Sequence, residues 1–269
     1  MRGINRLCPS PSLSVILLLL CLLSGTQGFF PSDWRERFFG NGGVSHEAQT
    51  RDAYDTLARK YFPDITPITA NMIKARTAMA EANMKVDDDQ TSSAKHFDGE
   101  NFVGGQALLV QAKANVISAL RDGNGESARD FLGAALHTLQ DFYAHTNWVE
   151  MGNSDINFDL GKEGRQLSTI GFSQRTCNEC GFGGLDRLLL GCHDCPTNTN
   201  GFTQLTSGYY EGEDSPAGGA DIPEWKCRHG KSISLLRRIA LFYRYKSLKA
   251  SLHICVIARY PFRHWIRST

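Results

Sequence analysis

Apolar side chains recur at helical spacing through the first half of the chain, and turn residues divide this pattern into four predicted helices. The first starts after Ser45, an N-cap residue, and ends before Pro63. Its apolar positions are Ala53, Tyr54, Leu57, Ala58 and Tyr61. The second is predicted to begin at Thr66-Pro67, as an N-cap followed by a proline at the first helical position. Its apolar side holds Ile68, Met72, Ile73, Met79 and Ala82.

Two more helices are predicted over residues 102–120 and about 128–148, with His96 in the connection before them. Ser127 and Asp130 have the spacing of a capping box at the start of the fourth helix. After Glu150 the sequence becomes rich in Gly, Asn and Cys, which predicts irregular loops to about residue 230 with a short strand near residues 202–210. A last apolar and basic segment, residues 232–265, can form one or two helices. The pattern predicts a mainly α protein, a helical bundle with a Cys-rich irregular C-terminal region.

The first 28 residues have the composition of a secretory signal peptide. Arg2 and Arg6 precede an apolar run from Leu13 to Leu23 that only Ser14 interrupts, and Thr26-Gln27-Gly28 offers small residues for cleavage. The run is well short of the ~20 residues that a membrane-spanning helix needs. We therefore expect a mature chain that begins near Phe29 and is secreted to the extracellular space.

Export changes the interpretation of the cysteines. Six of them lie outside the predicted signal: Cys177, Cys180, Cys192, Cys195, Cys227 and Cys255. In a cytosolic protein the two Cys-x2-Cys pairs at 177–180 and 192–195 would resemble a zinc knuckle. An oxidising compartment favours disulfides instead, in a connectivity that the spacing does not define.

The overall charge of +1 conceals two parts of different composition. All 28 acidic residues lie before Trp225, whereas the 45 residues from Trp225 onward contain 11 Lys+Arg and no acid. We therefore divide the mature chain into a domain at 29–230, with Cys-rich loops at 151–230, and a basic tail at 231–269. The tail can rest on an anionic membrane or fold back on the acidic domain. We find no nucleic-acid signature.

The fourth predicted helix carries chemistry on the side opposite its core stripe. Phe131, Leu132, Ala135, Leu136, Leu139, Phe142 and Tyr143 form that stripe, an arc of about 140°. The spacing i, i+4, i+8 places His137, Asp141 and His145 together on the other side, within about 80°. Small or uncharged residues surround them: Gly133, Ala134, Thr138 and Ala144. A solvated face normally carries long charged side chains, so we expect this side to be buried as well.

A buried carboxylate between imidazoles indicates a metal site. Burial of an unpaired carboxylate costs several kcal/mol, and imidazole with carboxylate is an ordinary zinc ligand set. Because each step of four residues rises about 6 Å, these ligands favour two nearby ions over one. One helix cannot complete the coordination, so we expect further ligands from His46, His96 and Asp98. The alternative is a hydrogen-bonded network in which Asp141 holds the imidazoles without a metal.

Residues 136–150, LHTLQDFYAHTNWVE, closely resemble the N-terminal region of the family of von Willebrand factor A domain-containing protein 7, which includes the fungal Het-C proteins. Shorter segments share the resemblance: residues 29–31, 44–47, 96–100, 201–203, 205–209 and 226–230. Together they cover about residues 29–230. Longer family members continue into a von Willebrand A domain that this chain lacks. Our hypothesis is that the tail, which leaves the family pattern after Gly230, is an alternative or read-through C-terminus.

The family in turn is distantly similar to the all-helical fold of zinc-dependent phospholipase C and S1/P1 nuclease. The similarity implies that His46 is an early histidine ligand, Asp98 a carboxylate ligand, and His137 with Asp141 the His-x3-Asp pair of the central helix. His145 is a looser match. The N-terminal Trp ligand and the later His-x3-Glu pair of those enzymes have no counterpart. This implies a non-catalytic role in interaction or adhesion, with an extracellular protein partner. The alternative is a zinc-dependent hydrolase of a phosphodiester or lipid, with Asp98 as general base.

Overall fold

The computed structural model describes residues 45–148, 151–153, 155–171, 173–174 and 204–208. Its helices are α3 (His46–Tyr61), α4 (Ala70–Met84), the 3-10 turn η1 (Lys85–Asp88), α5 (Ser93–His96), α6 (Phe102–Arg121) and α7 (Gly125–His145). The predicted signal peptide, the six cysteines and the basic tail lie outside the described residues. The mainly helical class is confirmed. Within the described residues, no helix is both long and apolar enough to cross a membrane.

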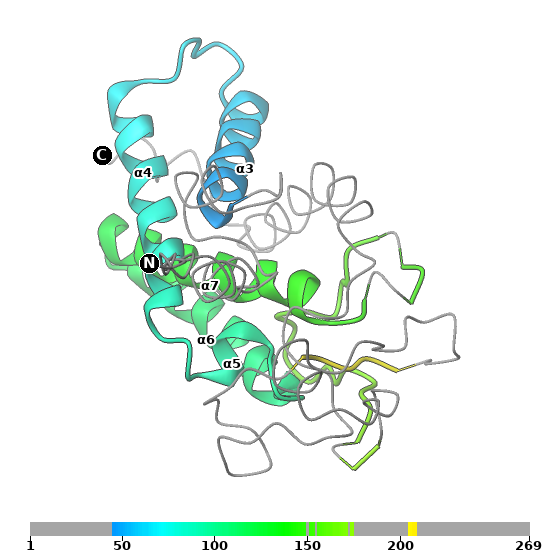
Figure 1. Ribbon diagram of the computed structural model, residues 1–269. Coiled ribbons are helices and arrows are strands. Elements are labelled where there is room, and N and C mark those ends of the chain that lie inside the picture. The colour runs from blue at the N-terminus through cyan, green and yellow to red at the C-terminus, as the bar shows by residue number, and fades with distance from the viewer. Residues whose placement is uncertain (1–44, 149–150, 154, 172, 175–203, 209–269) are drawn as a thin grey trace, which may run out of the picture.

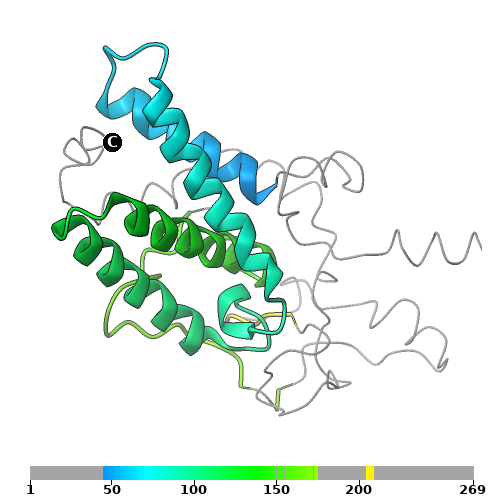
Figure 2. The same ribbon diagram turned by 90° about the vertical axis from the view of Figure 1, so that its left-hand side faces the viewer.

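α7 lies at the centre of the helical arrangement. α6 runs beside it on one side, and α3 and α4 cross it on the other (Figure 1, Figure 2). One apolar cluster joins α7 to α6 and to the segments that follow: Phe97, Phe102, Leu109, Ala135, Leu139, Phe142, Tyr143, Leu160 and Leu205. The other joins α7 to α3 and α4: Tyr54, Ala58, Met72, Ala75, Met79, Val116, Leu132 and Leu136. Because both clusters use α7, this helix is buried on more than one face.

Two apolar residues were assigned to the core wrongly. Phe131 is 39% exposed, since it stands at the edge of the predicted arc on α7. Ile73 is 42% exposed, because α4 packs through Met72 and Met79 on a neighbouring face. The second buried face of α7 is confirmed, since His137, Thr138 and Asp141 are buried.

The start of α3 matches the sequence pattern, and that of α4 does not. The Ser45 hydroxyl accepts a hydrogen bond from the Ala48 amide at 3.0 Å, as an N-cap does. The prediction that Thr66-Pro67 starts α4 is wrong. That peptide bond is cis, and the helix begins three residues later, where the Thr69 hydroxyl accepts from the Met72 amide. The hydroxyl of either threonine can cap a helix, but only Thr69 directly precedes the first turn of α4.

The predicted limits of α7 also need correction. Asn124 caps the helix by accepting from the Ser127 amide at 3.0 Å, so the proposed capping box at Ser127 is wrong. Gly123, with φ of 72°, makes the sharp turn after α6 that places Asn124 there. At the other end the chain becomes extended at Thr146, whose hydroxyl donates to the Phe142 carbonyl. The helix therefore ends at His145 and not at residue 148.

The segment around His96 is a short helix followed by an unusual turn. His96 ends α5, where a plain connection was expected, and Phe97, Gly99 and Glu100 then have positive φ values of 54°, 59° and 61°. Residues 204–208 hold this turn: the Gly99 amide donates to the Gly208 carbonyl at 2.7 Å, and the Glu100 amide to the Ser207 hydroxyl at 2.7 Å. Only isolated bridges occur in these five residues, so the strand expected near 202–210 does not form among them.

Candidate metal centre

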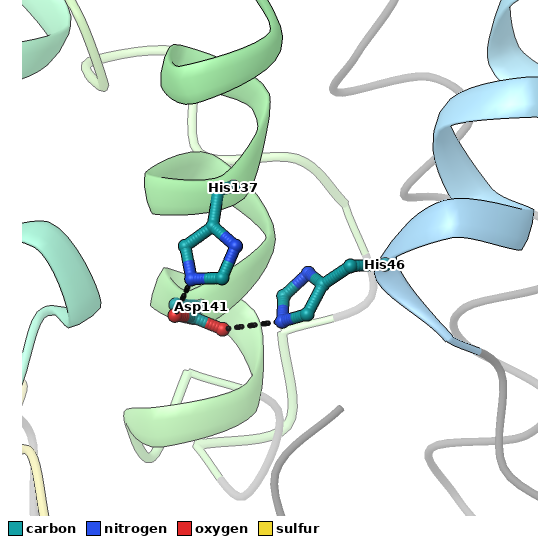
Figure 3. A group of neighbouring side chains, drawn as sticks. All are labelled: His46, His137 and Asp141. Atoms are coloured by element: carbon teal, nitrogen blue, oxygen red, sulfur yellow. Dashed lines mark ion pairs between the residues drawn. The ribbon is translucent and has the colours of Figure 1, made fainter. Parts of the chain in front are cut away.

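Three histidine side chains from three helices converge on the Asp141 carboxylate. His46 is the first residue of α3, His96 the last of α5, and His137 lies one turn before Asp141 on α7. Asp141 Oδ1 lies 3.2 Å from His46 Nε2, and Asp141 Oδ2 lies 2.8 Å from both His137 Nε2 and His96 Nδ1. Figure 3 shows the carboxylate paired with the rings of both His46 and His137. The structure thus brings together residues that are up to 95 positions apart in the sequence.

The group is enclosed by protein. His137 has no exposed surface, His46 and Asp141 are 1% exposed, and His96 is 2% exposed. The rings of His46 and His137 stack with their centroids 4.1 Å apart. Charges in such a place need close partners, because burial removes the water that would otherwise solvate them.

The outer nitrogen of each imidazole faces a hydrogen-bond acceptor. His46 Nδ1 lies 2.7 Å from Gln140 Oε1, and His96 Nε2 lies 2.9 Å from the Asp89 carbonyl oxygen. His137 Nδ1 lies 3.3 Å from Asn83 Oδ1. A neutral imidazole has one N–H, and these acceptors take it. The inner nitrogens then present lone pairs to a carboxylate and to each other, an arrangement that a cation bound between them would stabilise.

Asp141 Oδ1 supplies a second observation in favour of a metal ion. This oxygen is buried, and among the described residues no group donates a hydrogen bond to it. The ligand atoms of His46, His137 and Asp141 all lie within 4.8 Å of one another, as do those of Asp87, His96 and His137. The donor set and the orphaned oxygen both fit a bound metal ion, at two overlapping positions that share His137.

The electrostatics of the group centre on Asp141. Burial opposes ionisation of this carboxyl, but His145, His137 and His46 outweigh burial and hold its pKa well below the usual range. Burial also lowers the pKa of His46 and His96, and the adjacent Asp141 more than offsets this, so both pKa values are raised. Burial prevails at His137, whose pKa is lowered. His137 therefore favours the neutral form that binds metals.

Asp98 and His145 form the next layer. His145 Nδ1 lies 3.1 Å from Asp98 Oδ1 and 2.8 Å from the His96 carbonyl oxygen, while His145 Nε2 is 3.6 Å from Asp141 Oδ1. Asp141 and Asp98 overcome the effect of burial and raise the pKa of His145 to about 9. Asp98 thus faces one nitrogen of His145 while the other faces Asp141. Its assignment as a metal ligand or general base stays a prediction.

Sequence reasoning did not select Asp87, Asn83 or Gln140. Asp87 Oδ1 lies 3.6 Å from His137 Nε2, although in the sequence Asp87 is simply the first of three consecutive aspartates. Gln140 precedes Asp141 on α7, and its apolar neighbours in the sequence were a usable signal that its side chain is buried. The sequence holds no such signal for Asn83, because its contact with His137 depends on how α4 crosses α7.

Comparisons with known proteins agree on one family. The VWA7 N-terminal domain profile matches residues 53–240, well over half of the chain. Von Willebrand factor A domain-containing protein 7 of Homo sapiens is 32% identical over 253 residues, which cover 82% of this chain and 26% of the human protein. The proteins of the same name from Rattus norvegicus and Mus musculus are each 30% identical, over 80% of this chain and 26% of their own length.

The chain spans about a quarter of the length of these relatives. No solved structure matches it, so the similarity to zinc-dependent phospholipase C stays a prediction. The profile match and the identity to the three mammalian proteins show that the chain belongs to the family defined by the VWA7 N-terminal domain.

Proposed function

We propose that this chain is a secreted, extracellular protein whose helical domain binds zinc at His46, His96, His137 and Asp141, in a non-catalytic role in interaction or adhesion. One observation carries the metal assignment: the outer nitrogens of three buried imidazoles face acceptors, and their inner nitrogens face one buried carboxylate. Export is supported by the apolar run near the N-terminus.

The donor atoms favour zinc over the other common extracellular cations. Calcium and magnesium prefer shells made of oxygen atoms, whereas imidazole nitrogen suits zinc and its transition-metal neighbours. Imidazole and carboxylate are both ordinary donors to tetrahedral zinc. Asp87, half-buried beside His137, would supply a further oxygen to an ion on the His96 side.

Enclosure of the ligands supports a structural role. Structural zinc sites are closed by their protein ligands, whereas catalytic sites keep one position open for water. His46, His137 and Asp141 have almost no exposed surface. An ion held here would join α3 to α7, and through His96 also α5, and would keep the domain rigid for contact with a partner.

Metal analysis tests this proposal directly. We expect the full chain, purified from the medium of expressing cells, to contain about one zinc per molecule, and His137→Ala to retain less than about a tenth of that, because His137 belongs to both ligand groups. Plasma emission spectrometry measures the content. Gln111→Ala, at an exposed site on α6, serves as control and should keep its zinc. Metal-free wild-type protein would contradict the zinc assignment, and absence from the medium would contradict secretion.

A second function, zinc-dependent hydrolysis of phosphodiesters, is favoured by the position of Asp141. Its two oxygens face different histidines, Oδ1 toward His46 and Oδ2 toward His96 and His137, as a carboxylate does when it bridges two ions. Bound zinc would lower the pKa of a coordinated water toward about 7 and so supply a nucleophile.

Hydrolysis is measurable with bis(p-nitrophenyl) phosphate and with phosphatidylcholine vesicles. We expect zinc-loaded wild type to release no more product than zinc-treated Asp141→Ala, because His46, His137 and Asp141 are almost fully buried, as the ligands of a closed structural site are. Release by the wild type that a chelator stops and that Asp141→Ala lacks would establish the hydrolase in place of the structural role.

A further inference from the structure

Three buried polar side chains adjoin the candidate metal centre and hydrogen-bond to one another and to its imidazoles. Thr50 comes from α3, Asn83 from α4 and Gln140 from α7, and each is at most 1% exposed. Asn83 Nδ2 donates to the Thr50 hydroxyl oxygen at 2.8 Å, and Gln140 Nε2 donates to the same oxygen at 3.4 Å. Thr50 is thus a common acceptor for two amide groups.

The direction of these hydrogen bonds determines what the imidazoles meet. Because both amide NH2 groups point to Thr50, both amide carbonyls point toward the metal centre. Gln140 Oε1 faces His46 Nδ1 at 2.7 Å and accepts from Asn83 Nδ2 at 3.0 Å. Asn83 Oδ1 faces His137 Nδ1 at 3.3 Å. Carbonyl oxygens only accept, so each of these Nδ1 atoms carries the proton.

Thr50 favours this orientation over the reverse one. If both amides were flipped, two carbonyl oxygens would face the Thr50 hydroxyl, which has a single proton to donate, so one carbonyl oxygen would lie against the hydroxyl oxygen with no hydrogen between them. In the observed orientation the same hydroxyl oxygen accepts both N–H groups, one on each lone pair.

We propose that Thr50, Asn83 and Gln140 are positioning residues that hold His46 and His137 in the Nδ1–H tautomer, so that both Nε2 lone pairs are presented to the metal. This inference deepens the proposed zinc function and rests on it. Outer hydrogen bonds of this kind orient ligands and adjust their affinity for metal. None of the three side chains needs to touch the ion.

Thr50→Val tests the network, because valine keeps the shape of threonine and removes the acceptor. We expect zinc affinity, measured by competition with a chromogenic chelator, to fall about 10-fold. In the metal-free protein at alkaline pH, long-range ¹H–¹⁵N correlation spectra should show His46 and His137 as Nδ1–H in wild type and as a mixture of tautomers in Thr50→Val. Thr56→Val, on the same helix and in an exposed hydrogen bond, should match the wild type.

Thr50→Ser should restore both the affinity and the tautomers, because it keeps the hydroxyl; this separates the network from a folding defect, which circular dichroism checks independently. Folded Thr50→Val with wild-type tautomers would overturn the inference. Wild-type protein that shows the Nδ1–H tautomers but binds no zinc would refute the proposed function and leave the network established.

Discussion

Asp141→Asn is expected to lower the free energy of unfolding of the metal-free protein at neutral pH by about 3–5 kcal/mol, the usual cost of removing one partner from a buried ion pair. The carboxylate faces His46, His96 and His137 within 3.2 Å, and an amide cannot balance the charge of His46 and His96, whose pKa values Asp141 raises. Because the pKa of Asp141 is depressed in the folded state, its contribution is present above the ordinary aspartate pKa and lost as the pH falls through the folded value. Urea unfolding at neutral pH measures it.

The same variant should lose its response to zinc. Zinc at about 100 times its dissociation constant should stabilise the wild type by about 2.7 kcal/mol, because only the folded state holds the ligands together. Addition of a chelator should reverse the gain in Tm. Asp130→Asn provides the matched control, since Asp130 is exposed on the same helix. Equal zinc responses of wild type and Asp141→Asn would contradict the proposed ligand set.

Gly133→Ala is expected to destabilise the protein although alanine is the better helix former. A Cβ at this position would lie 2.4 Å from the Met79 carbonyl oxygen and 2.7 Å from the Ala82 Cβ, so the α4 backbone would have to move. Alanine gains about 0.8–1.0 kcal/mol in helix propensity, while overpacking costs about 1–3 kcal/mol. A clash with backbone falls in the upper half of that range, so we expect a net loss of about 1–2 kcal/mol. Chemical denaturation of both proteins measures the difference.

The displacement should also weaken zinc binding. The same Cβ would lie 3.1 Å from the Asn83 amide nitrogen, so the shift moves the residue whose side chain faces His137. Gly171→Ala is the control, because a Cβ there meets nothing within 4 Å. A Gly133→Ala protein of wild-type stability would show that α4 can move away from α7 at little cost, and would contradict this account of the crossing.

Helix ends show how far local sequence decides the structure. Ser45 was predicted and observed as the cap of α3, whereas the structure uses Thr69 and Asn124 where Thr66 and Ser127 were expected. Each of these side chains can cap a helix, and a cap contributes only about 1 kcal/mol. Packing of the helices that follow is enough to decide between two such caps three residues apart.

The sequence by itself determined the mainly helical class and the two faces of α7, with His137 and Asp141 on a charge-poor surface, because the helical period depends only on neighbouring residues. Tertiary structure decided which distant groups join them. His46 arrives by the packing of α3, Asp87 and Asn83 by the close crossing of α4 over Gly133, and His96 by the turn that residues 204–208 hold. Such contacts depend on how whole helices pack against one another. The spacing of apolar residues within one helix does not indicate where another helix lies.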